Sequence, residues 1–560
     1  MGMRGRAIVA ALVVLVSAAS IVYATTQAPE DERSSSAAET LAADEAGRLG
    51  PIQRACRLPR EHLRRINRGY HRVHSEDVTI VPKAPNYWGS FSIVSHSGPW
   101  NYLQRVPLVL YGPGYIVPQG ATLDGSASLA DVYPTIETLL DADFAARTGE
   151  ALTEALAPVA VDPPKLIVTI MWDGVGRNVL ERWPDRWPTL ARLEREGTSY
   201  YDAMVGSSPS ITPATHATLA TGAYPKDHEV VNINYRGDNG EPRVIFENGN
   251  PRALKLTTFS DQWDRAKRNR PKVGLLAWKP WHMPMLGHGS QTRRGDKDVL
   301  GLIHVGGKVT GSDEFYRTPK YLRNKSYLLR RRADELDKED GEADGEWLGH
   351  EIMGDREDNP AYVRYQGDLA LRMLKKGGFG DDGVPDLFLA NFKQTDLAGH
   401  VNTVDSQEMA QNLRAQDDQL GRLVDYLDES LSGDYVVILS ADHGHTRAPS
   451  ETGAWPVEPV EFKADIQRRF GVPASKKLYH STSPVGPFLK RHLMKRYGIT
   501  PHEIAEYLNG YTIRDNWPAG RRLPKGYRNR GDERILAAAW ATDDLPKVLA
   551  CSRNRDSSAE

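Results

Sequence analysis

The chain has 560 residues, of which 40% are hydrophobic and 26% are charged, and its formal net charge is −2 at pH 7. Such a chain can bury a substantial core, which is typical of a large globular protein. The near-neutral balance gives no reason to expect nucleic acid as a partner, and no internal repeat or extended low-complexity domain is evident.

The amino-terminal residues predict export. Arg4 and Arg6 precede an apolar stretch at 7–24 whose end fits the small-residue rule for signal cleavage. The stretch also approaches the length of one membrane span, so an uncleaved anchor is the alternative. We therefore expect a signal peptide or membrane anchor at 1–28, a disordered linker at 29–50, and an extracytoplasmic body that is secreted or membrane-anchored.

Strand-length apolar runs alternate with helical patterns along the rest of the chain. The predicted strands are 106–111, 166–171, 273–278, 386–391, 435–440 and 535–540. The predicted helices are 188–196, 360–376, 407–431 and one that begins after Thr500, with Pro501 in its first turn and Glu503 completing a capping box. This alternation predicts an α/β fold with a mostly parallel central sheet covered by helices on both faces, in one domain over 51–560.

Two distant strings pair a carboxylate with an imidazole. In TDLAGH, Asp396 and His400 stand four residues apart, so they can share one face of a helical turn around one ion. In SADHGH, Asp442 and His443 follow the predicted strand 435–440, and open α/β sheets hold ligands at such strand ends. Oxygen and imidazole ligands without thiolate suit zinc best, with manganese or iron possible and calcium less suited.

Two further strings add a third carboxylate and a hydroxyl nucleophile to these possible metal ligands. WDGVG adds Asp173 directly after an apolar run, and SITPATHATLATG at 210–222 offers a hydroxyl nucleophile. Two divalent ions roughly 4 Å apart can polarise a phosphoryl oxygen, lower the pKa of a hydroxyl and stabilise a leaving oxygen. Each string alone is more often a capped turn or surface ion pair. Their joint occurrence beside predicted strands predicts a metal-assisted hydrolase.

Together the strings resemble the alkaline phosphatase superfamily over about residues 80–551, most closely its type I phosphodiesterase and nucleotide pyrophosphatase branch and the related threonine-nucleophile phosphatases. The resemblance implies two divalent metal ions as cofactors, which we expect to be zinc. One ion would be held by Asp173, Thr212, Asp442 and His443, and the other by Asp396, His400 and a distant histidine.

The resemblance also selects the nucleophile. Several hydroxyls lie close together, namely Ser207, Ser208, Ser210, Thr212 and Thr215, and most hydroxyls before a helix are N-caps. The family places its nucleophile four residues before the histidine of HxTLxTG, which here is His216, so Thr212 fits. A helix that begins just after Thr212 would direct backbone N–H groups and its positive dipole end at a phosphate. His216 is then a packing or supporting residue.

The distant histidine does not lie where the family has it. Family members end with a string like HGSPxxYDxxVPxxxYG and a helix like DIAPTLxxLL. Here the similar strings are HSGPWNYLQRVPLVLYGPG at 96–114 and LADVYPTIETLLDAD at 129–143. We interpret residues 51–150 as a circularly permuted carboxyl-terminal segment, since domain termini commonly lie close together at the surface. His96 would complete the second site, and His480 is the alternative in ordinary chain order.

The pairing of the two cysteines can be predicted from the same interpretation. Cys56 lies just before the permuted segment, and Cys551 lies just after the predicted strand 535–540. Permutation would bring these ends together, so we predict a disulfide in an oxidising compartment.

The resemblance also implies which parts of the chain recognise the substrate. Residues 240–358 are expected to form a cap insertion over the site, where the superfamily determines substrate choice. Asn234 resembles the family's phosphate-oxygen donor, although Asn232 competes for the role. Lys279 resembles a lysine of the monoesterase branch, but Trp281 stands where that branch has an arginine. Loss of that cation favours a phosphodiester or pyrophosphate substrate.

The expected activity is therefore that of an exported hydrolase of small phosphoester substrates. The ionised Thr212 oxygen would attack phosphorus to give a phosphothreonine, and water activated at the second metal would hydrolyse it. A phosphomonoesterase shares every residue named, so it remains an alternative. A non-catalytic pseudoenzyme that only binds phosphoesters is the alternative of another class. A sulfatase is disfavoured because a CxPxR-like context is absent.

Overall fold

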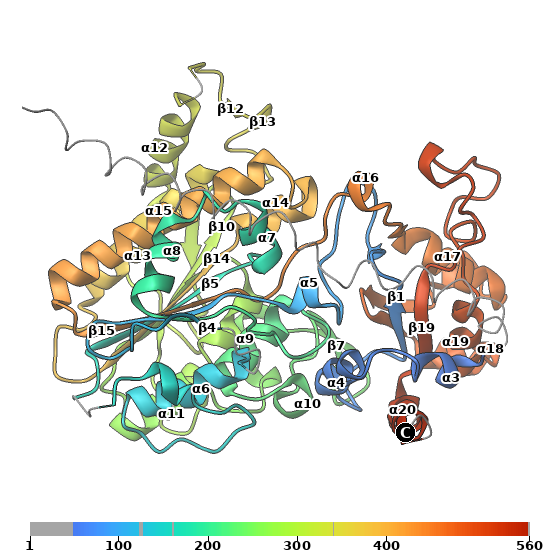
Figure 1. Cartoon of the computed structure of the whole chain (residues 1–560), viewed down its shortest axis with the longest axis horizontal. Coiled ribbons are helices and arrows are strands. Elements are labelled where there is room, and N and C mark those ends of the chain that lie inside the picture. Colours follow the sequence, from blue (N-terminus) through green and yellow to red (C-terminus); the bar gives the residue numbers. More distant parts are fainter. Residues whose placement is uncertain (1–48, 123–126, 159–161, 340, 558–560) are drawn as a thin grey trace, which may run out of the picture. The chain divides into compact units, whose positions relative to one another are not determined.

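A nine-stranded sheet forms the centre of the protein, in the order β11-β10-β9-β14-β5-β15-β3-β6-β4 (Figure 1). Five neighbouring strands run parallel: β10 (Val299–His304), β9 (Val273–Ala277), β14 (Asp386–Phe392), β5 (Leu166–Trp172) and β15 (Tyr435–Ser440). The edges carry β11 (Lys308–Thr310), antiparallel to β10, and on the other side β3 (Leu108–Tyr111), β6 (Thr198–Tyr200) and β4 (Gly120–Thr122). The predicted α/β fold with a mostly parallel sheet is confirmed.

The computed structural model describes residues 49–122, 127–158, 162–339 and 341–557. Residues 51–560 form one unit, to which the rest of the description applies. The predicted signal peptide or anchor at 1–28, and all but the last two residues of the predicted linker, lie outside the described residues. Among the described helices, none combines the length and apolarity needed to cross a membrane.

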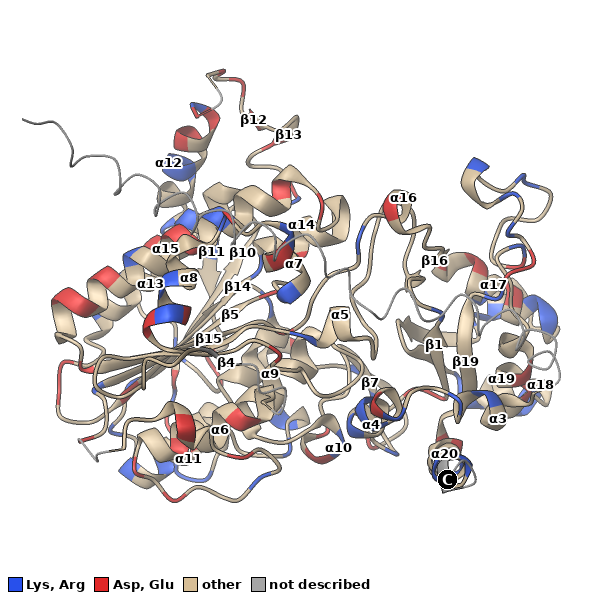
Figure 2. Ribbon diagram, viewed as in Figure 1, with Lys and Arg blue, Asp and Glu red and all other residues tan. Residues whose placement is uncertain are grey.

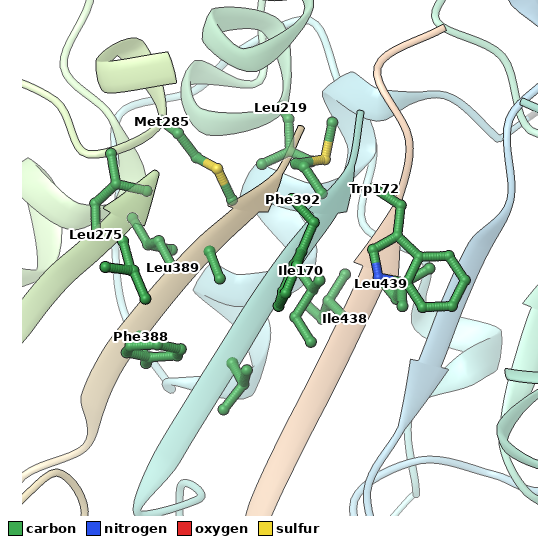
Figure 3. Packing of buried hydrophobic residues seen from close by; sticks show 14 of the residues in the cluster. Ile170, Trp172, Leu219, Leu275, Met285, Phe388, Leu389, Phe392, Ile438 and Leu439 are labelled. Carbon is green, nitrogen blue, oxygen red and sulfur yellow. The ribbon is translucent and has the colours of Figure 1, made fainter. Parts of the chain in front are cut away.

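The central strands are apolar because both faces of the sheet are covered. All seven residues of β5 and all six of β15 are buried, and neither strand carries a charged side chain. Figure 2 accordingly shows charge mainly on helices and loops. In Figure 3, Ile170 of β5, Leu389 of β14 and Leu439 of β15 pack in one cluster with Leu219 and Met285. Full burial of one such side chain stabilises the fold by about 1.5–3 kcal/mol.

Helices lie on both faces of this sheet (Figure 1). On one face are α12 (Ser326–Asp337), α13 (Pro360–Gly377), α14 (Gln394–Asn402) and α15 (Gln407–Leu431), and on the other are α6 (Val132–Leu139), α9 (Thr212–Thr221) and α11 (Phe259–Lys267). Shorter helices are α5 (Asn101–Gln104), α7 (Arg177–Arg182), α8 (Pro188–Glu196), α10 (Pro225–His228) and α16 (Pro449–Thr452). The predicted helices 188–196 and 407–431 match α8 and α15. A proline in the first turn marks the start of α8, and a residue in the left-handed conformation follows the last turn of α15.

A second apolar cluster lies around a small sheet. β1 (Val78–Pro82) pairs antiparallel with β19 (Leu536–Ala541), and the pair packs with α19 (Pro501–Asn509), whose predicted Thr500 capping box is present. Nearby elements are α17 (Pro459–Arg469), β17 (Tyr479–Ser483), β18 (Gly486–Leu489) and α18 (Arg491–Tyr497). The predicted strand 535–540 is therefore a strand, but it lies outside the central sheet. An apolar run indicates a buried strand without indicating its partner.

The prediction of a cap insertion at 240–358 is wrong for part of that range. We expected it to form an insertion, yet it supplies β9, β10 and β11 to the central sheet. What remains outside the sheet includes α12 and the two-residue strands β12 (Glu346–Trp347) and β13 (His350–Glu351). β10 is a short apolar run that precedes the charged residues around 330–346, and so short a run indicates a strand only weakly.

The chain ends of this unit are joined covalently. Cys56 follows α3 (Pro51–Ala55), and Cys551 lies in α20 (Leu545–Ser557). The two cysteines form the predicted disulfide, with 5.7 Å between their Cα atoms and a sequence separation of 495. Leu545 and Val548 of α20 pack in the same apolar cluster as Ala55 and Cys56.

Removal of this disulfide is expected to destabilise the protein. Cys56→Ser together with Cys551→Ser should lower the free energy of unfolding by about 2–5 kcal/mol, because the crosslink restricts a very long loop in the unfolded chain. Urea titration followed by tryptophan fluorescence measures the loss. The wild type kept in reductant should shift by a similar amount, and equal midpoints for all three proteins would contradict the expectation.

Candidate functional site

Three buried carboxylates meet at the carboxyl ends of three adjacent parallel strands. Asp173 directly follows β5, Asp442 lies two residues after β15, and Asp396 lies in the first turn of α14, just after β14. Since β14, β5 and β15 are neighbours with the same direction, their ends lie at one edge of the sheet. The backbone N–H of Gly174 donates to Asp442 at 2.9 Å, which ties two of these loops together.

One oxygen of Asp396 is surrounded by imidazole nitrogens. Its Oδ1 lies near the Nε2 atoms of His445 at 3.3 Å, His96 at 3.5 Å, His400 at 3.5 Å and His443 at 3.8 Å. It nevertheless has no hydrogen-bond partner among the described residues. Ligand bonds of about 2.0–2.1 Å around a tetrahedral ion place ligand atoms roughly 3.3 Å apart. The spacing is therefore that of groups able to share a metal ion.

Backbone carbonyls orient these imidazoles. Three rings donate from Nδ1 to a backbone carbonyl. His400 donates to Val94 O at 2.5 Å, His96 to Ser210 O at 3.2 Å, and His443 to Gly444 O at 3.0 Å. A neutral ring that donates from Nδ1 keeps its lone pair on Nε2, the nitrogen that faces Asp396. Burial lowers the pKa of His96 far below its usual value and that of His443 to about 3, so both rings are neutral at neutral pH.

A second group forms around Asp173 and Asp442. Asp442 Oδ2 lies 3.3 Å from His443 Nε2, and Asp173 Oδ1 lies 3.7 Å from the same nitrogen. His282 Nε2 approaches Asp173 Oδ2 at 3.2 Å. Possible ligand atoms of Asp173, Asp442 and His216 all lie within 4.8 Å of one another. His443 therefore lies between the two groups, in contact with all three carboxylates.

A buried lysine compensates part of this negative charge. Lys393 Nζ lies 2.5 Å from Asp396 Oδ2 and 3.1 Å from Asp173 Oδ1. Burial by itself would raise the pKa of both carboxyls, but the ammonium group holds the pKa of each below its ordinary value. Burial and the neighbouring Asp173 raise the pKa of Asp442. One ammonium does not balance three carboxylates, and buried charges are usually paired or bound to metals.

Thr212 lies beside these groups at the first residue of α9, after the N-cap residue Ile211. His216, one turn later, donates from Nδ1 to Thr212 O at 2.8 Å. On the other side, Ser210 O accepts the hydrogen bond from His96. The hydroxyls of Ser210 and Thr215 are occupied by backbone carbonyls, to which they donate as structural side chains do.

Two glycines make room for His445. Gly174 has a φ of +76°, and a Cβ there would lie 2.8 Å from Cδ2 of His445. A Cβ at Gly399 would lie 2.6 Å from Cε1 of the same ring. The glycines of the WDG and AGH strings are therefore required by the packing of a buried imidazole.

In the described part of the chain, no hydrogen bond or ion pair joins several predicted residues to the clustered carboxylates. Asn234 lies in the hairpin of β7 (Asn234–Arg236) and β8 (Pro242–Val244), paired with Val244. Its competitor Asn232 is buried, and within the described residues its Nδ2 has no hydrogen-bond partner. Lys279 Nζ faces Glu357 at 3.6 Å. His480 lies in β17, where its charged neighbours include Arg236 and Glu241 rather than the clustered carboxylates.

Sequence reasoning missed four residues of the cluster: His445, His282, Lys393 and Asn391. His445 was detectable, because it follows His443 by two residues in the same string. His282 stands among aromatic and methionine residues, of which Trp278, Met283 and Met285 are core, so its sequence context does not indicate a polar site. Asn391 donates to Asp173 at 3.2 Å from the end of β14, and no local pattern indicates that contact.

The chain is similar to several known proteins. A family model described as type I phosphodiesterase / nucleotide pyrophosphatase matches residues 167–555. A protein of Myroides odoratus named calcium-transporting ATPase is 23% identical over 65% of this chain and 71% of its own length. Alkaline phosphatase PhoV of Synechococcus elongatus is 20% identical over 52% of this chain and 61% of its own. The structure of wild-type alkaline phosphatase PafA is 17% identical, covers 68% of this chain and 85% of that chain, and has a TM-score of 0.49.

Substitution of Lys393 should reveal the charge imbalance. In chelator, Lys393→Met is expected to lower the free energy of unfolding by about 3–5 kcal/mol, because two buried carboxylates lose their counter-charge. Added divalent ions should reduce this loss, because they supply positive charge to the same carboxylates. Urea titration with and without metal measures both effects.

Lys272 provides the matched control, since it is partly exposed and also faces two carboxylates, the exposed Asp382 at 2.6 Å and the buried Asp386 at 3.4 Å, which accepts backbone N–H bonds as well. Lys272→Met should cost less than about 1 kcal/mol in either condition. Equal stability losses for the two variants in chelator would contradict the role given to Lys393.

Proposed function

Because the chain belongs to the type I phosphodiesterase and nucleotide pyrophosphatase family and is a phosphoric ester hydrolase, we propose that it cleaves phosphodiesters or pyrophosphates through a phosphothreonine at Thr212. The proposal is carried by one observation. Asp396 Oδ1 has four imidazole nitrogens within 3.8 Å and no hydrogen bond among the described residues, beside two more carboxylates and a helix N-terminus.

The donor set fits divalent metal ions. Asp442 Oδ2, His443 Nε2 and both ring nitrogens of His445 are buried without hydrogen-bond partners in the described part of the chain. Imidazole nitrogens and carboxylate oxygens without thiolate are the ligands that zinc prefers. We assign Asp396, His400 and His96 to one ion, and Asp173, Asp442, His443 and Thr212 to the other, with His445 as a further donor to the first.

When bound, two such ions would neutralise charge on the phosphoryl group and lower the pKa of nearby hydroxyls. The protein contributes the positions of the reacting groups. Thr212 begins a ten-residue buried helix whose N-terminal N–H groups and positive dipole end can face phosphate oxygens. Attack by its oxygen would form the P–O bond to threonine as the ester bond breaks, and water would then cleave the phosphothreonine.

The surroundings of Lys279 favour a diester over a monoester. A monoester carries one more negative charge, which a free cation would stabilise. Lys279 is instead paired with Glu357, and Trp281 in the same short helical segment packs against the central core. For contact with a non-bridging oxygen, Asn232 is the stronger candidate, because its buried amide nitrogen lacks a partner within the described residues.

We also propose that the segment before β5 is a permuted carboxyl-terminal segment. The family match begins at Ile167, after this segment. Nevertheless β3 pairs with β15 in the central sheet, and the ring of His96 stacks on that of His443 with centroids 3.4 Å apart. A segment that carries a sheet strand and a site histidine, but precedes the family match, is what permutation would produce.

Export is the remaining part of the proposal. The disulfide between Cys56 and Cys551 supports an oxidising compartment, since such bonds are rare in reducing cytosol. We propose that residues 1–28 act as signal peptide or membrane anchor and that the body works outside the cytoplasm.

The nucleophile can be tested directly. Thr212→Ala is expected to lower kcat roughly 10³–10⁶-fold with the metal content unchanged, because the attacking oxygen is lost. Acid quenching during turnover, followed by peptide mass analysis, should detect phosphate on Thr212 of the wild type. Thr212→Ser keeps a hydroxyl and should retain measurable turnover. Full activity of Thr212→Ala would exclude this residue as nucleophile.

Substrate class is tested with paired nitrophenyl esters. We expect kcat/KM for bis(nitrophenyl) phosphate to exceed that for nitrophenyl phosphate by at least about tenfold, a difference of 1.4 kcal/mol in transition-state stabilisation. Dialysis against chelator should abolish both activities, and zinc should restore them. A reversed ratio would identify a phosphomonoesterase, whereas metal binding without chelator-sensitive hydrolysis would indicate a pseudoenzyme.

A further inference from the structure

A second group of possible metal ligands lies apart from the residues described above. His71 and His74 occupy the turn between α4 (Arg60–Gly69) and β1, and Glu229 follows α10. Possible ligand atoms of these three residues all lie within 4.8 Å of one another. None of the three is among the proposed ligands of the candidate active site, so the group requires an explanation of its own.

The distances are those of a shared coordination sphere. Glu229 Oε2 lies 2.8 Å from His74 Nε2, and its Oε1 lies 3.9 Å from His71 Nε2. These values bracket the roughly 3.3 Å separation of ligand atoms around a tetrahedral zinc ion. The two imidazole rings are stacked with centroids 4.5 Å apart, and both Nε2 atoms lie near the same carboxylate. Asp238 Oδ1, 3.7 Å from His74 Nε2, offers a fourth donor.

The backbone sets the tautomer of His74. Its Nδ1 lies 2.6 Å from Arg236 O, a carbonyl that can only accept, so Nδ1 carries a proton. In a neutral ring Nε2 then holds a lone pair, and it faces the carboxylate oxygen of Glu229. Two acceptors at 2.8 Å repel each other unless a cation lies between them or the ring is protonated. A histidine bonded to a carbonyl through its other nitrogen is the usual arrangement of a metal ligand.

The ligands are held in place before any ion binds. His71 N–H donates to Ser75 Oγ at 3.0 Å, and Ser75 N–H donates to His71 O at 3.0 Å, which closes the turn that carries both histidines. Arg236 N–H donates back to His74 O at 3.3 Å, so β7 and this turn are paired. His74 is buried, and Tyr235 packs edge-on against its ring. Little conformational entropy therefore remains to be lost on binding.

We propose that His71, His74 and Glu229, with Asp238 completing the set, bind a structural divalent transition-metal ion. Two imidazoles with two carboxylates suit zinc. The ion would join the segment 60–77 to the loop after α10 and to the turn after β7, both of which lie more than 150 residues further along the chain. This site is separate from the proposed catalytic ions, so it requires one more ion per chain than the active site does.

Metal analysis of the whole protein tests the proposal. The wild type and His71→Gln, Glu229→Gln and His74→Gln variants are loaded with zinc, passed over a desalting column, and measured by mass spectrometry of the metal. Each variant is expected to hold about one zinc ion fewer per chain than the wild type and to show a lower melting temperature. Hydrolysis of a nitrophenyl diester should remain near the wild-type rate, because none of these residues belongs to the proposed catalytic machinery.

His350→Gln is the matched control, since His350 faces Glu408 at 3.1 Å with Arg356 on its other nitrogen and no second histidine. It should keep the wild-type zinc content. Cobalt provides a second measurement, because a tetrahedral site adds an intense visible band that Glu229→Gln should remove even where a histidine variant folds poorly. Equal zinc content in the wild type and all three variants would overturn the proposal, and would assign His74 and Glu229 to an ordinary ion pair.

Discussion

Parallel pairing of β14, β5 and β15 is the constraint on which the candidate active site depends. Because the three strands are adjacent and point the same way, the residues that follow them are brought to one edge of the sheet. Asp173, Asp396 and Asp442 come from positions up to 269 residues apart, yet each needs only its own strand to be in register. The apolar core beneath them, seen in Figure 3, fixes that register, since a slip by one residue would exchange side chains between the two buried faces and disrupt their packing.

Convergence of three acids creates an electrostatic cost that the rest of the site offsets. Burying an unpaired carboxylate costs several kcal/mol, so the acids require cations. Lys393 supplies one positive charge from within the chain, and neutral imidazoles supply lone pairs rather than charge. The arrangement is consequently suited to divalent ions, and burial lowers the pKa of His96 and of His443, so these two rings resist protonation. The two glycines beside His445 show that backbone space is also reserved for this purpose.

The amino-terminal segment links this site to the chain ends. It contributes β3 to the central sheet and His96 to the cluster, β1 to the small sheet, and Cys56 to the disulfide with Cys551. The turn after α4 lies in the same segment, and there His71 and His74 face Glu229. Long-range crosslinks of different chemistry therefore hold one stretch of chain against several distant elements. Of these, the disulfide persists in the unfolded chain, and it lowers the entropy of that chain because it closes a very long loop.

The sequence by itself determined the elements and the identities of most reactive groups. Apolar runs marked β5, β14 and β15 because strands buried on both faces cannot carry polar side chains, and the TDLAGH and SADHGH strings identified four of the clustered residues. Contacts between distant parts of the chain were decided only by the tertiary structure. β19 pairs with β1 instead of joining the central sheet, and His96 contacts Asp396 while His480 does not. Asn391 at the end of β14, Lys393 just after it and the distant His282 all reach Asp173. The local sequence pattern indicates whether a residue is buried, because the spacing of apolar residues follows the geometry of the helix or strand that contains them. Which distant residue it meets depends on the packing of the whole chain, and no short stretch encodes that.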